Sequence, residues 1–137
     1  MEAKIRWIGG LSFAGLADSG HWVVMDTDAS SGGSDGSATP LEMVLLGLGG
    51  CTSMDVVSIL QKMRVTFDRC ETVLGAERAG EHPKVFTKIK IEYRFWGRDI
   101  NPQKVEKAVH LSMTKYCSVS AMLGKAVQIE HGYRINP

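Results

Sequence analysis

Hydrophobic and polar residues alternate along several stretches of the chain, which is the pattern of half-buried β-strands. Near the start, three short alternating runs predict an antiparallel meander with strands at 3–8, 11–17 and 21–26. Further along, two longer runs flank the turn at 80–83 and predict strands at 65–78 and 84–96. A last run predicts a strand at 125–135.

A long apolar segment between the two groups of strands predicts a central helix. Thr39 suits the N-cap, Pro40 the first helical position, and Glu42 the acidic first turn. The apolar pattern then continues to about Arg64. Three glycines interrupt the middle of this segment: Gly47, Gly49 and Gly50. Each costs about 1 kcal/mol of helix stability against alanine, so a close approach of another backbone or access to a small pocket is expected there.

The remaining segments complete the order of elements. Residues 27–39 hold no large apolar side chain, so they are predicted to form a mobile loop. Asn101-Pro102 begins a second helix, and a short third helix is predicted at 118–123, before Gly124. The predicted fold is therefore α+β, with the order β-β-β-α-β-β-α-α-β.

The apolar character of the central helix predicts a partner subunit. A helix that is hydrophobic nearly all round needs cover on more than one side, and one sheet covers only one side. Its uncharged stretch, 43–54, is shorter than the roughly 20 residues that span a bilayer, so a buried core helix is expected and no membrane contact. The N-terminus has no apolar signal sequence, which predicts a cytoplasmic protein.

Length and charge limit the remaining possibilities. The chain has 137 residues, which suits a single domain at 1–137. Its formal net charge is +1, and its basic residues are scattered along the whole length. A nucleic-acid-binding protein normally carries a clustered basic stripe, so no nucleic-acid partner is expected.

Cysteines are the residues most suited to chemistry. The chain has three cysteines and no secretion signal, which argues against a disulfide scaffold. Cys51 follows two glycines inside the predicted helix, which leaves its sulfur unshielded on that side, although a buried cysteine can also be inert packing. Cys117 lies at the joint of the last two helices, where a helix N-terminus favours the thiolate. Cys70 lies between charged residues of a predicted strand and is interpreted as structural.

No metal and no cofactor are expected. The chain has no Cys-x-x-Cys and no His-x-x-x-His, and its four histidines are far apart in sequence. The glycines at 47–50 fall in mid-helix, whereas nucleotide-binding glycine motifs lie between a strand and a helix.

Three segments together strongly resemble the OsmC/Ohr family, in its YhfA-like branch: 40–52, 59–64 and 117–120. The resemblance covers nearly the whole chain. It implies an intertwined homodimer in which antiparallel sheets enclose the long central helix. It also implies a thiol peroxidase that reduces small organic hydroperoxides, with an external dithiol as reductant. Carried over by position, Cys51 would be the peroxidatic cysteine and Cys117 the resolving one.

The chain departs from the family pattern at the residues that support the thiolate. Hydroperoxide-reducing members have a glutamate directly after the motif proline, whereas here Leu41 stands there and Glu42 follows. Those members also use an arginine from an early strand turn, and residues 11–20 contain none. Candidate supporting residues are therefore Glu42, Asp55, Arg6 and Arg64. Asp55 follows Cys51 by one helical turn and would raise the thiol pKa unless a cation neutralises it.

The functional hypothesis is a thiol-dependent hydroperoxide reductase that acts in the response to oxidative stress. The alternative is a catalytically weak dimer that binds a small apolar ligand or acts as a redox-responsive partner protein.

Overall fold

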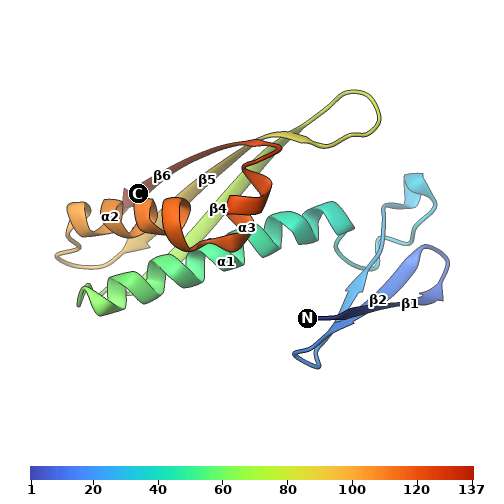
Figure 1. The fold of residues 1–137 in the computed structure, drawn as a ribbon, viewed down its shortest axis with the longest axis horizontal. Helices are drawn as coiled ribbons and strands as arrows, with labels where there is room; N and C mark the ends of the chain where they lie inside the picture. Colours follow the sequence, from blue (N-terminus) through green and yellow to red (C-terminus); the bar gives the residue numbers. More distant parts are fainter. The chain divides into compact units, whose positions relative to one another are not determined.

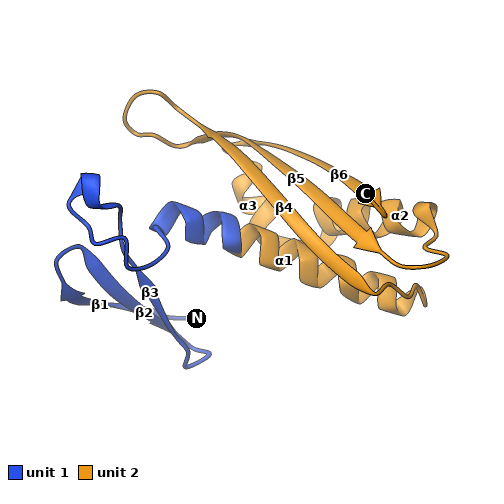
Figure 2. Ribbon diagram, turned by 180° about the vertical axis from the view of Figure 1, so that it is seen from behind, with its two compact units in different colours: residues 1–46 blue, residues 47–137 orange.

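The computed structural model describes residues 1–137 and shows a mixed α+β fold, with two three-stranded sheets and three α-helices (Figure 1). The α+β class predicted from the sequence is confirmed. The chain divides into two compact units, Met1–Leu46 and Gly47–Pro137 (Figure 2). Each unit contains one of the two sheets.

The first unit contains the predicted antiparallel meander. Its strands, in the order β1-β2-β3, are β1 (Ala3–Gly9), β2 (Ser12–Ala17) and β3 (Trp22–Met25). The sheet leaves large apolar side chains exposed, among them Ile5, Trp7 and Trp22. Uncovered aromatic side chains on a short sheet are typical of a surface that another chain covers, and the predicted partner subunit would supply that cover.

Asp26, directly after β3, ties the following loop to the sheet. Its carboxylate accepts the backbone N–H groups of Thr27 at 2.8 Å, Ser34 at 3.2 Å and Gly36 at 3.0 Å. It also accepts the Ser34 hydroxyl. The hydroxyl of Ser34 and these N–H groups hold the pKa of Asp26 well below its ordinary value. The loop predicted to be mobile is therefore fastened at its base, and it includes a short 3₁₀ helix, Ala29–Ser31.

Helix α1 (Pro40–Lys62) begins where the cap residues predicted. The Glu42 N–H donates to Thr39 Oγ1 at 3.3 Å, and the Thr39 N–H donates to Glu42 Oε2 at 2.7 Å. This reciprocal arrangement is a capping box, and its hydrogen bonds from Thr39 lower the pKa of Glu42. By length and composition alone α1 is apolar enough to cross a membrane, but a core helix of this composition passes the same test.

The second unit is a sheet in the order β4-β5-β6, with β4 (Arg69–Arg78), β5 (Phe86–Trp96) and β6 (Gln128–Ile135). Strands β4 and β5 are antiparallel, but β6 runs parallel to β5. The expectation of antiparallel sheets is therefore wrong for this pair. The chain leaves β5 through α2 (Pro102–Leu111) and α3 (Ser118–Leu123), and such a crossover is what a parallel neighbour requires.

Helices cover one face of this sheet (Figure 1). The alternation of β5 places four buried side chains on that face: Ile89, Ile91, Tyr93 and Phe95. The part of α1 in this unit buries a residue at every fourth position: Leu48, Thr52, Val56 and Leu60. Helix α2 adds Val105, Ala108 and Val109. The core thus lies between the sheet and its helices.

Gly49 explains one of the three helix glycines. A Cβ built on Gly49 would lie 2.7 Å from Leu74 Cδ1 of β4, which is closer than real contacts allow. The expected close approach therefore occurs here, with a strand side chain rather than another backbone. Gly47 and Gly50 have nothing within 4 Å of such a Cβ, so these positions leave the helix surface open.

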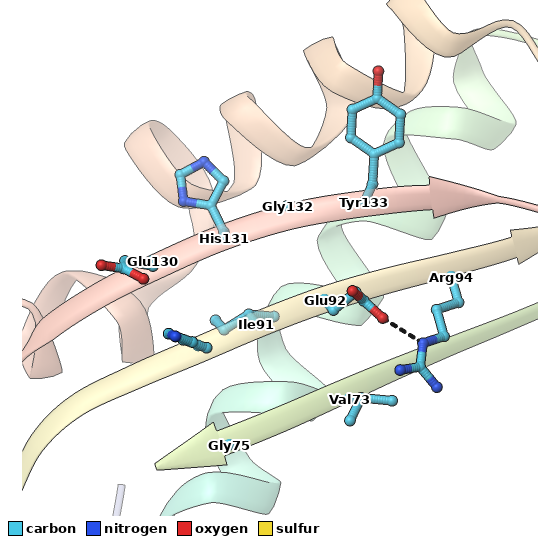
Figure 3. A pocket seen from close by; sticks show the side chains of 10 residues that line it. Val73, Gly75, Ile91, Glu92, Arg94, Glu130, His131, Gly132 and Tyr133 are labelled. Carbon is cyan, nitrogen blue, oxygen red and sulfur yellow. Dashed lines mark hydrogen bonds and ion pairs between the residues drawn. The ribbon is translucent and has the colours of Figure 1, made fainter. Parts of the chain in front are cut away.

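The other face of the sheet carries paired charges (Figure 3). Glu92 binds Arg94 at 2.6 Å and Arg134 at 2.8 Å, and Lys88 binds Glu130 at 2.7 Å. This face also has a shallow hollow of about 480 Å³. This face carries charges of both signs, as expected for a solvated strand face, and forms no basic stripe.

We expect Asp26→Asn to lower the midpoint of thermal unfolding at neutral pH by several degrees, because an amide is a weaker acceptor for the N–H and hydroxyl groups around it. The folded pKa of Asp26 lies below its unfolded value, so this stabilisation is complete above the unfolded pKa and is lost as the pH falls. The gap between wild type and variant should therefore narrow from about pH 5 to about pH 3 in circular-dichroism melts. A gap that stays constant would contradict this assignment.

Candidate functional site

Two cysteines and an aspartate from separate parts of the second unit converge. Cys51 and Asp55 lie one turn apart on α1, and Cys117 immediately precedes α3. The two sulfur atoms and a carboxylate oxygen of Asp55 all lie within 4.8 Å of one another. Both thiols are free, with Cys117 buried and Cys51 half-buried. The structure therefore brings together the two sulfurs that the sequence singled out.

An irregular turn directs Cys117 toward the cluster. After α2 the chain forms a π-helical turn, Ser112–Tyr116, of a kind often found at functional sites. Cys117 then takes an extended backbone conformation as the N-cap of α3. The Ser120 N–H donates to Cys117 Sγ at 3.3 Å, which holds this sulfur in a defined position.

The surroundings of Cys51 oppose its thiolate. Burial raises the pKa of the Cys51 thiol, and its hydrogen bond with Cys117 raises it further. The negative charge of Asp55 acts in the same direction, as expected from the sequence, whereas the backbone N–H of Val119 acts against it. No lysine or arginine of the chain forms an ion pair with Asp55. Cys51 is therefore held mainly as the neutral thiol.

Three buried hydroxyls connect Asp55 to the core. Ser112 Oγ donates to Asp55 Oδ2 at 3.2 Å and lies 2.8 Å from Thr52 Oγ1. The Thr52 hydroxyl is also hydrogen-bonded to the Tyr93 hydroxyl. All three side chains are fully buried, and burial raises the pKa of Tyr93 to about 12, so Tyr93 keeps its proton at neutral pH.

The direction of these hydrogen bonds follows from counting protons. Each hydroxyl has a single hydrogen to donate, and the carboxylate of Asp55 can only accept. If Ser112 donates to Asp55, then Thr52 must donate to Ser112, and Tyr93 must donate to Thr52. The hydroxyl chain, Tyr93-Thr52-Ser112, therefore ends at Asp55 with every donor directed toward the carboxylate.

The residues of the hydroxyl chain were not predicted from the sequence, although the pattern of buried positions pointed to two of them. Thr52 is the polar member of the four-residue spacing that buries Leu48, Val56 and Leu60. Tyr93 likewise stands among the buried apolar residues of β5. A polar side chain on a buried face needs a partner, so each position pointed to an internal hydrogen bond.

The other candidate supporting residues are not members of this cluster. Arg6 and Glu42 belong to the first unit, where Arg6 stacks over the Trp22 ring at 5.3 Å and Glu42 completes the helix cap. Arg64 follows the C-terminal end of α1 in a left-handed conformation, nine positions after Asp55. Of the four candidates, Asp55 is therefore the one that the structure places beside both sulfurs.

Asp55 also forms part of the wall of a surface hollow. The hollow has a volume of about 250 Å³ and is lined by Asp55, Ser58, Ile59, Lys62, Leu111 and Tyr116. Asp55 is therefore close to both sulfurs and also lines a space open to solvent.

Two thiols and a carboxylate are donor types that zinc accepts. A structural zinc site has four protein ligands, however, and here three donors converge. We interpret the cluster as a thiol site, and the absence of a metal stays a prediction.

Known proteins resemble this chain over nearly its whole length. A family model described as "OsmC-like protein" matches residues 32–132. Protein YhfA of Escherichia coli K12 is 47% identical over 135 residues, which cover 98% of each chain. Among solved structures, a hypothetical protein from Aquifex aeolicus VF5 is 27% identical with a TM-score of 0.86, over 98% of this chain and 95% of the other. An organic hydroperoxide resistance protein OsmC from Legionella pneumophila is 14% identical with a TM-score of 0.72, over 96% and 94%, which supports the fold alone.

We expect Thr52→Val to lower the free energy of unfolding by about 1–3 kcal/mol, because it leaves the buried Tyr93 and Ser112 hydroxyls without their shared partner. Thr52→Ser, which keeps the hydroxyl, is the matched control and should cost less. Urea unfolding measures both variants. Equal stability of Thr52→Val and wild type would contradict the hydroxyl chain.

Proposed function

Because this chain belongs to the OsmC-like protein family, we propose that it is a thiol-dependent hydroperoxide reductase that uses Cys51 and Cys117. The observation that carries the proposal is the approach of the two free sulfurs to within 4.8 Å. Two thiols at this separation can join as a disulfide after small side-chain rotations. The names of fold neighbours, organic hydroperoxide resistance proteins, agree with this activity.

Accessibility supports Cys51 as the residue that meets the peroxide. Cys117 is only 2% exposed, whereas Cys51 is half-buried on the helix surface. Cys51 would attack the peroxide and become a sulfenic acid, and Cys117 would condense with it to form a disulfide. An external dithiol would then reduce the disulfide by thiol exchange.

The surface near Cys51 favours an organic peroxide. On α1, Gly50 leaves open space beside the cysteine, and Met54 one turn later is 75% exposed. A hydroperoxide with an apolar group gains from contact with such a surface, whereas hydrogen peroxide does not. A homodimer would cover the exposed apolar side chains of both units, and the proposed protein is a cytoplasmic dimer without nucleic-acid or membrane partners.

We expect the wild-type protein to consume cumene hydroperoxide with dithiothreitol as the reductant, and Cys51→Ser to reduce this rate to that of the protein-free mixture. Without the dithiol, Cys117→Ser should react once with the peroxide and accumulate Cys51 sulfenic acid, which dimedone labels. Cys70→Ser is the matched control and should keep the full rate, because Cys70 lies outside the cluster. Equal peroxide consumption by wild type and Cys51→Ser would eliminate this function.

The raised pKa of the Cys51 thiol gives a second test. We expect iodoacetamide to alkylate Cys51 slowly at neutral pH, with a rate that still rises steeply above about pH 9.5, where an ordinary exposed thiol of pKa about 8.5 approaches its plateau. The sign follows because only the thiolate reacts, and its fraction grows about tenfold per pH unit below the pKa. Peptide mass spectrometry measures labelling at Cys51 separately from the other cysteines. A plateau below about pH 7.5 would contradict the raised pKa.

The same raised pKa favours one alternative function, a redox-responsive partner protein that forms the disulfide without rapid turnover. A neutral thiol attacks peroxide slowly, so oxidation would then be stoichiometric. Disulfide formation by one equivalent of peroxide, with no steady-state consumption under several dithiols, would favour this alternative over the reductase.

A further inference from the structure

We propose that Asp55 is a further catalytic residue of this site, the proton carrier that serves both thiols. The inference rests on the proposed reductase function. It starts from the position of one carboxyl group within 4.8 Å of Cys51 Sγ and Cys117 Sγ. One bridging water or a small side-chain rotation is enough for a proton to pass between a sulfur and the carboxylate over this distance. Catalytic hydrogen bonds are often long before substrate binds.

A carboxyl group is unexpected in this cluster, because its negative charge opposes ionisation of the two thiols beside it. The groups that titrate around it are the thiols of Cys51 and Cys117 and the phenol of Tyr93, and all three lose a proton to become negative. Lys62 is the basic residue that lines the adjoining hollow, and it forms no ion pair with Asp55. A negative group beside two thiols disfavours their thiolates, so a neutral side chain at this position would leave the thiols more reactive. A carboxylate is useful here if it accepts the thiol protons during the reaction.

The hydroxyl chain prepares Asp55 for this role. Ser112 donates its hydroxyl hydrogen to Asp55 Oδ2. The Ser112 oxygen accepts from Thr52, and the Thr52 oxygen accepts from Tyr93. The Ser112 hydroxyl fixes the orientation of the carboxyl group and leaves Oδ1 for a second partner. The adjoining hollow of about 250 Å³ lets the carboxyl group exchange protons with solvent between turnovers.

In the first half-reaction, Asp55 accepts the Sγ proton of Cys51 while the sulfur electron pair forms a bond to the terminal oxygen of the hydroperoxide. The O–O bond breaks, and the departing alkoxide takes the proton from Asp55 and leaves as an alcohol. Sulfur is oxidised to the sulfenic acid, and the peroxide is reduced.

In the second half-reaction, Asp55 accepts the Sγ proton of Cys117 while this sulfur bonds to the sulfur of Cys51. The S–O bond breaks, and the leaving hydroxide takes the same proton and departs as water. Because the carboxylate is regenerated each time, one residue serves both steps, and the external dithiol supplies the electrons that reduce the disulfide.

Asp55→Asn tests this assignment with two measurements that should move in opposite directions. Removing the negative charge should speed alkylation of Cys51 by iodoacetamide at neutral pH, because the thiolate fraction rises. Single-turnover oxidation of Cys51 by cumene hydroperoxide should instead fall by about a hundredfold, the usual effect of losing a general acid–base group. A carboxyl that acts only through its charge would raise both rates.

The leaving group provides a further readout. Peracetic acid releases acetate, which needs no proton, so Asp55→Asn should slow its reaction far less than that of cumene hydroperoxide. Asp55→Glu retains a carboxyl group and should restore part of the lost rate. Glu106→Gln removes an exposed carboxyl group on α2 and is the matched control that should change neither rate.

Each outcome decides between the proposals. Wild-type protein that cumene hydroperoxide does not oxidise would overturn the reductase function and the role of Asp55 with it. Wild-type oxidation that Asp55→Asn leaves as fast or makes faster would overturn the role of Asp55 alone. An equal loss of rate for both peroxides, with no gain in alkylation and a lowered melting temperature, would identify Asp55 as structural.

Discussion

The second unit depends on the hydrogen bonding of three buried hydroxyls. Thr52 comes from α1, Tyr93 from β5 and Ser112 from the turn after α2, so a single chain of hydrogen bonds joins helix, sheet and turn. A buried hydroxyl without a partner costs about 1–3 kcal/mol, and the three therefore constrain one another's positions. The same hydrogen bonds fix the position of Asp55 and of the irregular turn that precedes Cys117. The packing of the core therefore determines the geometry of the thiol cluster.

The electrostatics of this cluster differ from those of a thiol activated by a neighbouring cation. Burial and two acidic neighbours raise the pKa of Cys51, and within the chain no arginine or lysine pairs with Asp55. A site of this kind must remove the thiol proton during the attack rather than before it. Base catalysis by a neighbouring carboxylate provides that route without a standing thiolate, and it keeps the resting thiols unreactive toward chance oxidants.

The chain also leaves much apolar surface exposed. Trp7 and Trp22 project from the first sheet and Met54 from α1, and each is at least 48% exposed. Exposed aromatic and methionine side chains in this number are typical of surfaces buried by association. The family resemblance and this surface together are the physical basis for the proposed homodimer.

The sequence by itself determined the local elements and the chemistry available to them. Thr39, Pro40 and Glu42 predicted the start of α1, and alternation predicted the buried face of β5. The sequence also singled out Cys51 and Cys117, which the structure brings together, and their reactivity stays a prediction. These features follow from interactions within a few residues, which a sequence records directly. The parallel pairing of β6, the contact of Gly49 with Leu74, and the convergence of Ser112 on Asp55 were decided only by the tertiary structure. They join residues far apart in the chain, and which distant polar groups become partners depends on how helices and sheet pack to exclude water.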